Sequence, residues 1–189
     1  EISAVEGAIE QRFIDERTVV AGPAGGEIAG SGAAVGGATG ASTVDDAVLF
    51  LARLSGGGVA SFEATRLATG FHNANRFEIH GERGALRFDF ERMNELGYYD
   101  ASGEGQTAGW ATIDVTRGDD GHPYADAWWP DSHGLGYEHG FVNQAADILT
   151  MIGGRAPVVP MPDFADALKT QRVLHAAIAS ARERSPITI

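Results

Sequence analysis

The stretch from Arg66 to Phe90 constrains the fold most, because its side chains alternate as they do in a β-hairpin. After a polar crossing, an apolar-rich run leads to Gly81-Glu-Arg-Gly84, whose glycines tolerate the positive φ of a tight turn. The following strand places Leu86, Phe88 and Phe90 on one face and charged side chains on the other. A small sheet with one apolar face is unstable alone, so we expect the rest of the chain to cover it.

Other runs extend this hairpin into one antiparallel, meander-like sheet of about seven strands. Residues 2–13 alternate as a half-buried strand, with Val5 and Ile9 on one face. Residues 47–54 are apolar on both faces, which is typical of a central strand. The remaining strands are predicted at residues 59–68, 96–99, 110–115 and, as a final edge strand, 186–189.

Two helices are predicted near the end of the chain. Apolar residues recur with the helical period from Phe141 to Ile152 (Phe141, Ala145, Ile148, Leu149 and Ile152), and Gly153 ends that helix. Asp163 is the expected N-cap of the second helix. Its predicted inward stripe is Phe164, Leu168, Gln171, Leu174, Ile178 and Ala181. We therefore predict an α+β fold, a predominantly antiparallel open-faced β-sheet with helices packed on one face, whose free face suits another subunit.

Composition narrows the class of protein. With 189 residues and 43% hydrophobic content, residues 1–189 are expected to form a single domain. The net charge of −12 argues against nucleic acid and anionic membranes as partners. The chain has no cysteine, which excludes disulfides and thiolate metal sites and fits a reducing, cytoplasmic location.

Residues 21–42 are nearly all Gly, Ala and Ser, and we expect them to form a flexible loop. The run from Gly30 to Gly36 resembles a dinucleotide-binding turn but lacks the buried strand before it and the helix after it. No cofactor site is therefore assigned to this chain. Residue 1 is Glu and the sequence opens within an expected strand, so a fragment of a longer protein is expected.

Two segments together carry a family resemblance. The run from Ala68 to Leu96 includes Ala-Thr-Gly-Phe-His-Asn, Glu78-Ile-His-Gly-Glu-Arg-Gly-Ala-Leu-Arg-Phe-Asp89 and Asn94-Glu-Leu96. It resembles the C-terminal domain of the Gfo/Idh/MocA oxidoreductases, the relatives of glucose–fructose oxidoreductase and inositol dehydrogenase. The run Trp128-Trp-Pro-Asp-Ser-His-Gly-Leu-Gly-Tyr-Glu-His-Gly-Phe141 is similar to a loop and helix start in a sugar-dehydrogenase branch of that family.

The resemblance implies a parent enzyme with an N-terminal Rossmann domain, which holds NAD or NADP, and a catalytic lysine in a Glu-Lys-Pro motif. This chain has no such motif, and its only lysine, Lys169, matches no catalytic position. The chain then corresponds to the substrate-binding and oligomerisation domain of an NAD(P)-dependent sugar or cyclitol dehydrogenase, inactive without the Rossmann half. The alternative is a non-catalytic module that binds a ligand or a protein partner through its exposed sheet.

Seven residues are candidates for contact with a small-molecule sugar or polyol. The resemblance places Phe71 and His72 at the substrate side of the domain. The imidazole of His72 and the amides of Asn73 and Asn75 can each both donate and accept hydrogen bonds. Three open alternatives are that the asparagines only shape a loop, that one of the paired tryptophans only fills space, and that His133 or His139 has a structural role at the helix entry. A metal is not expected, because the histidine spacing fits no metal motif. The candidates are Phe71, His72, Asn73, Asn75, Trp129, His133 and His139.

Overall fold

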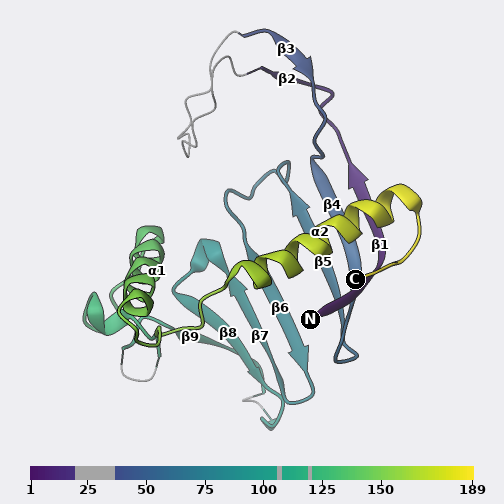
Figure 1. Ribbon diagram of the computed structural model, residues 1–189. Helices are drawn as coiled ribbons and strands as arrows, with labels where there is room; N and C mark the ends of the chain where they lie inside the picture. Colours follow the sequence, from purple (N-terminus) through teal and green to yellow (C-terminus); the bar gives the residue numbers. More distant parts are fainter. Residues whose placement is uncertain (20–36, 106–107, 119–120) are drawn as a thin grey trace. The chain divides into compact units, whose positions relative to one another are not determined.

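The computed structural model describes residues 1–19, 37–105, 108–118 and 121–189 (Figure 1). The chain forms two compact units. Unit 1 contains residues 1–69 and 163–189, and unit 2 contains residues 70–162. Each unit combines an antiparallel sheet with one α-helix, so the predicted α+β class is confirmed. The assignment of residues 1–189 to a single domain stays a prediction.

Unit 1 is a four-stranded sheet in the order β10-β1-β4-β5, crossed by helix α2 (Figure 1). A separate two-stranded ribbon, β2-β3, extends beyond the ends of β1 and β4. All pairs of neighbouring strands are antiparallel. The elements are β1 (Ile2–Gln11), β2 (Glu16–Thr18), β3 (Thr39–Ala41), β4 (Ala47–Leu54), β5 (Val59–Thr65), α2 (Phe164–Glu183) and β10 (Ile187–Thr188).

Strand β1 contains two bulges that decide which of its side chains face the helix. Its register with β4 shifts between Ile2 and Ala4, and again between Val5 and Gly7. An extra residue in one strand moves the side chains that follow it to the opposite face. Val5 is consequently fully buried, whereas Ile9 is 63% exposed. The prediction that these two side chains share a face is wrong.

Small side chains, and not the predicted apolar stripe, face the sheet from α2. Ala176, Ala177 and Ser180 are buried. Leu168 is 52% exposed and Phe164 is 95% exposed. Small residues allow the helix to approach β1 closely, and the larger apolar residues then lie along its flank. The helix and its N-cap, in which the Asp163 carboxylate accepts the Asp166 N–H, are confirmed, but the inward face is corrected.

Asp46 is a buried carboxylate at the base of the β2-β3 ribbon. Its Oδ2 atom accepts hydrogen bonds from the backbone N–H of Phe13 at 2.7 Å and of Ile14 at 2.8 Å. Its Oδ1 atom pairs with the Arg17 guanidinium. The Ile14 and Phe13 bonds hold the pKa of Asp46 below its ordinary value, and Arg17 adds to this effect.

Unit 2 is a four-stranded sheet in the order β6-β7-β8-β9, followed by helix α1. Every neighbouring pair is antiparallel, and the hairpin predicted around residues 81–84 is the β6-β7 pair. The elements are β6 (Arg76–Gly81), β7 (Gly84–Asp89), the 3₁₀ turn η1 (Phe90–Arg92), β8 (Glu95–Asp100), β9 (Trp110–Asp114), the 3₁₀ turn η3 (Ala125–Ala127) and α1 (Tyr137–Ile152).

The strands therefore form two four-stranded sheets, and the prediction of one seven-stranded meander is wrong. The predicted strand positions themselves are confirmed. Residues 66–75 separate β5 from β6, and Gly70 there has a φ of +100°, which takes the backbone out of strand geometry. A tight hairpin that would continue one sheet does not form across this segment.

Gly84 is needed for a close approach and not for its φ. Its φ, like that of Gly81, is not positive, so the predicted reason for these glycines is wrong. A Cβ atom at Gly84 would lie 2.4 Å from the Tyr99 carbonyl oxygen of β8. Glycine thus allows β7 and β8 to pair at this position, where Gly84 lies opposite Asp100.

A flexible loop was predicted at residues 21–42. Residues 21–36 of it, which include the Gly30–Gly36 run, lie outside the described residues. Its end is ordered, because Thr39–Ala41 forms β3. No helix within the described part of the chain combines the length and apolar character that a membrane crossing requires.

Candidate functional site

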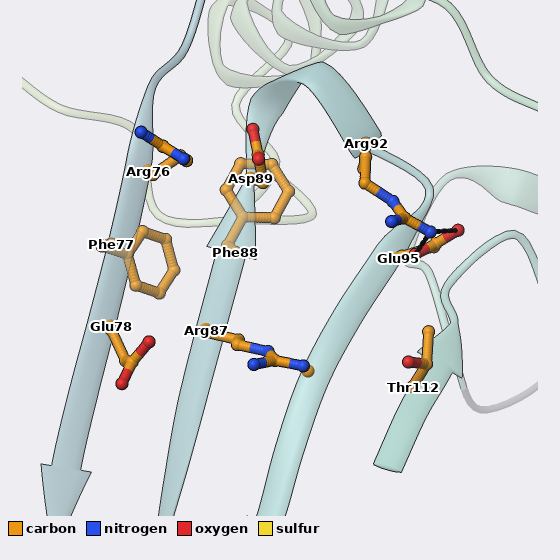
Figure 2. A pocket seen from close by; sticks show the side chains of 10 residues that line it. Arg76, Phe77, Glu78, Arg87, Phe88, Asp89, Arg92, Glu95 and Thr112 are labelled. Carbon is orange, nitrogen blue, oxygen red and sulfur yellow. Dashed lines mark hydrogen bonds and ion pairs between the residues drawn. The ribbon is translucent and has the colours of Figure 1, made fainter. Parts of the chain in front are cut away.

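The sheet of unit 2 has one apolar and one charged face. The strand registers place Phe77, Ile79, Leu86, Phe88, Leu96, Tyr98 and Ile113 on the apolar face, where Phe77 is 47% and Ile79 58% exposed. The opposite face has a depression of about 490 Å³ (Figure 2). Its lining includes three arginines, three carboxylates and a threonine: Arg76, Arg87, Arg92, Glu78, Asp89, Glu95 and Thr112.

Arg87 crosses this depression over a glycine. Its side chain lies over Gly97 of β8, where a Cβ atom would come within 2.5 Å of the Arg87 Cγ atom. The Arg87 guanidinium then stacks on the Trp110 ring at 4.4 Å from the ring centroid. A cation held on an aromatic face keeps its outer N–H groups available to a ligand. At the opposite end, Arg92 and Glu95 form an ion pair at 2.8 Å (Figure 2).

Four predicted site residues lie in the first loop, residues 70–75, beside the depression. The guanidinium of Arg76, which lines the depression, stacks on the Phe71 ring at 4.2 Å. The backbone N–H groups of His72 and Asn73 both donate to the carboxylate of Glu91, each at 2.8 Å. The Asn73 and His72 bonds hold the pKa of Glu91 below its ordinary value. The loop is therefore held by its backbone, and its side chains are exposed.

The turn η1 and the residues after it connect the first loop with a second loop, residues 128–136. The Phe90 N–H donates to the Asn75 carbonyl at 3.0 Å, and the Phe90 ring contacts that of Tyr137 at 5.7 Å between centroids. The Asn94 side chain bonds Leu135 in both directions, at 2.9 Å and 3.0 Å. Both loops that carry predicted site residues are thus attached to one turn.

His133 lies in the second loop with an assignable tautomer. Its Nδ1 atom lies 2.9 Å from the Pro130 carbonyl oxygen and 3.2 Å from that of Asp131. Carbonyl oxygens only accept, so the proton of the neutral ring lies on Nδ1, and Nε2 presents a lone pair. His133 is exposed, and this nitrogen can accept a hydrogen bond from a hydroxyl group.

The paired tryptophans differ in their surroundings. The Trp128 indole N–H donates to the Asn143 side chain at 2.8 Å, and its ring meets His139 edge-on at 4.3 Å. Trp129 is 52% exposed. The His139 Nδ1 atom accepts the Gly136 N–H at 2.9 Å at the start of α1, which is the helix-entry role left open by the sequence. Substrate roles for Trp129 and His139 stay predictions.

Helix α1 turns a polar face towards its own unit. Asp147 is buried, accepts the Tyr124 hydroxyl and also accepts the Val158 N–H at 2.9 Å. Burial and the bond to Asp147 raise the pKa of Tyr124 to about 12. The helix is confirmed, but its apolar stripe is exposed in this unit, with Ile148 at 45% and Ile152 at 78%. Buried hydrogen bonds of Asp147, together with the ring contact of Tyr137 with Phe90, attach this helix.

Chemically, the side chains of this site can donate hydrogen bonds to hydroxyl groups and accept hydrogen bonds from them. The two loops attached to the turn carry exposed imidazole and amide groups and an exposed indole, and guanidinium groups line the depression. Within residues 1–19, 37–105, 108–118 and 121–189, no three His, Cys, Asp or Glu side chains gather as metal ligands would. The Lys169 ammonium pairs with the Glu1 carboxylate at 2.5 Å, in unit 1.

Glu91 and Asn94, which hold the two loops of this site, are not among the residues predicted from the sequence. Glu91 reads as one more charged residue of an alternating strand, and Asn94 as part of a resemblance with no role attached. One local signal was available for the turn. Asp89 is a good turn-capping residue, and its carboxylate accepts the Glu91 N–H at 3.0 Å in the structure. The depression arises from strand register and from Gly97, which the sequence alone does not align.

The chain is similar to known proteins in sequence and in fold. The GFO/IDH/MocA C-terminal domain family matches residues 16–87. Levoglucosan dehydrogenase of Pseudarthrobacter phenanthrenivorans is 33% identical over 190 residues, which covers 100% of this chain and 47% of the enzyme. An oxidoreductase domain protein from Kribbella flavida has a TM-score of 0.83 at 43% identity, covering 100% of this chain and 46% of that one.

A solved complex of levoglucosan dehydrogenase with NADH and L-sorbose gives a TM-score of 0.82 at 31% identity, covering 100% of this chain and 45% of that one. A second complex of that enzyme holds NADH and levoglucosan, with a TM-score of 0.81. The chain spans about half the length of the relatives it matches. It matches the C-terminal part of a Gfo/Idh/MocA oxidoreductase.

Proposed function

We propose that this chain is the C-terminal substrate-binding and oligomerisation domain of an NAD-dependent sugar or cyclitol dehydrogenase, and that it is inactive by itself. The observation that carries the proposal is the alignment of the whole chain with levoglucosan dehydrogenase, whose solved complexes contain NADH with L-sorbose or levoglucosan. Those complexes favour NAD over NADP for the parent enzyme.

The chemistry assigns the chain an orienting role. Oxidation of a secondary alcohol needs a base for the hydroxyl proton and a fixed direction of the C–H bond towards the nicotinamide. When bound, the nicotinamide cofactor accepts the hydride. In the proposal, the first loop, with His72, and the second loop, with His133, bind the hydroxyl groups of the substrate and fix that direction.

Two exposed apolar surfaces support the proposed partners. The apolar face of the unit 2 sheet leaves Phe77, Ile79 and Ile113 between 42% and 58% exposed, and a second copy of the protein would cover it. The stripe on α1, with Leu149 at 68%, is a further uncovered surface. In the proposal, the nucleotide-binding half of the parent covers this stripe, since the relatives are about twice as long as this chain.

The parent enzyme tests the proposal through nicotinamide reduction. Purified parent protein with NAD⁺ is expected to reduce it in the presence of a sugar or polyol from a panel that includes levoglucosan and myo-inositol. His72→Ala and His133→Ala should each raise the KM for the sugar about tenfold, the cost of a lost hydrogen bond to substrate. His175→Ala, an exposed histidine of α2, is the matched control and should leave KM unchanged. A parent that reduces no nicotinamide with any of these alcohols would contradict the proposal and favour a non-catalytic binding module.

A further inference from the structure

The segment 90–94 holds the backbones of two loops that are far apart in the sequence. Glu91 lies within η1, and Asn94 lies just before β8. Both side chains bond to main-chain groups and leave the loop side chains exposed. Contacts of this kind fix the position of a loop without using its binding groups.

Glu91 holds the first loop through a single oxygen. Its Oε1 atom accepts the N–H groups of both His72 and Asn73. A charged acceptor makes stronger bonds than a neutral one, so Glu91 holds these amides more firmly than an amide side chain would. The position of Glu91 is itself fixed, because the Asp89 carboxylate accepts its N–H.

Asn94 holds the second loop through two hydrogen bonds between its side-chain amide and the backbone of Leu135. Its Oδ1 atom accepts the Leu135 N–H, and its Nδ2 group donates to the Leu135 carbonyl. Its own carbonyl accepts the Val115 N–H at 3.1 Å, which ties the residue to the end of β9. An aspartate here would keep the acceptor but lose the donor, so it would leave the Leu135 carbonyl unpaired.

We propose that Glu91 and Asn94 are positioning residues that fix the first loop and the second loop relative to each other, and so determine which sugar or polyol fits between them. This inference rests on the proposed function. Neither side chain has to touch the substrate. Because the two loops share one turn of backbone, a ligand that bridges them meets hydrogen-bonding groups at a set spacing.

Amide hydrogen exchange of the 189-residue chain tests the holding contacts without any activity. Glu91→Ala should accelerate exchange at His72 and Asn73, and Glu91→Gln should restore part of the protection, since its Oε1 can still accept. Asn94→Ala should accelerate exchange at Leu135, because it removes the acceptor of that N–H, whereas Asn94→Asp keeps an acceptor oxygen and should leave Leu135 protected. Glu82→Ala, in the turn between β6 and β7, is the control and should change none of these amides. Unchanged exchange in both test variants would overturn the proposal.

The parent enzyme tests the consequence. Glu91→Ala and Asn94→Ala are each expected to raise the KM for the sugar about tenfold, with NADH affinity unchanged and Glu91→Gln intermediate. The double variant should raise the KM by less than the product of the two single increases, because the first substitution already misplaces one loop. Accelerated exchange with unchanged KM would overturn the specificity role. An unsubstituted parent without dehydrogenase activity would instead contradict the proposed function, and the exchange measurement would still decide the positioning role.

Discussion

Replacing Asp46 by alanine is expected to lower the melting temperature of the chain by roughly 10 °C, because two part-buried backbone N–H groups lose their acceptor side chain. The substitution leaves the N–H groups of Phe13 and Ile14 without their acceptor and Arg17 without its partner. Asp46→Asn should cost less, because an amide oxygen still accepts hydrogen bonds. Asp45→Ala, at the exposed neighbouring residue, is the control and should have little effect.

The same carboxylate predicts acid sensitivity. The folded-state pKa of Asp46 is depressed below its ordinary value of 3.8, so the unfolded chain binds a proton more readily than the folded chain does. The stabilisation is therefore complete above about pH 5 and is lost as the pH falls through the folded-state pKa. Thermal unfolding followed by circular dichroism should show a steeper decline in acid for the natural sequence than for Asp46→Asn. Equal slopes would show that Asp46 does not hold the ribbon base.

Gly84→Val is expected to destabilise the chain by about 2 kcal/mol or more, because a new side chain would meet backbone. The Cβ atom would lie 2.4 Å from the Tyr99 carbonyl oxygen, so β7 and β8 would have to separate. Gly81→Ala is a matched control across the same turn, because its Cβ would lie 3.6 Å from the Gly84 carbonyl oxygen, an ordinary contact. Its free energy of unfolding in urea should change by no more than about 0.5 kcal/mol. Similar losses in both variants would contradict the close-approach reading of Gly84.

Local patterns were sufficient for both helices and for every strand except the short β2 and β3. Alternation located β1 and β7, an apolar run located β4, and helical periodicity with Asp163 and Gly153 located both helices. These signals depend on residues close in the sequence, so one sequence is enough to read them. The short strands β2 and β3 carry no comparable pattern and were missed.

Local patterns did not predict which face each strand or helix buries. A bulge after Val5 places Ile9 on the opposite face of the sheet, and the alternation of side chains in β1 does not indicate that bulge. In α2 the helix lies close to the sheet, so the small Ala177 is buried against it and the larger Leu168 is half exposed. In α1 the buried face holds Asp147 because its partners, among them Tyr124, come from other segments. These outcomes depend on contacts between distant residues, which periodicity does not contain.

In the candidate site, too, some residues could be predicted from the sequence and others could not. Exposed loop residues such as His72 and His133 were chosen by residue type and resemblance, and the structure places both in unit 2. The groups that hold the loops, Glu91 and Asn94, act through backbone bonds to residues about 20 and 40 positions away. Such contacts became visible only in the fold.

Titration of NADH into the isolated chain and into the parent protein tests the central claim most directly. If the chain is the substrate half of a dehydrogenase whose nucleotide site lies in the other half, the parent should bind NADH and the isolated chain should show no saturable binding by calorimetry. Saturable binding of NADH by the isolated chain, at an affinity comparable to that of the parent, would contradict the account.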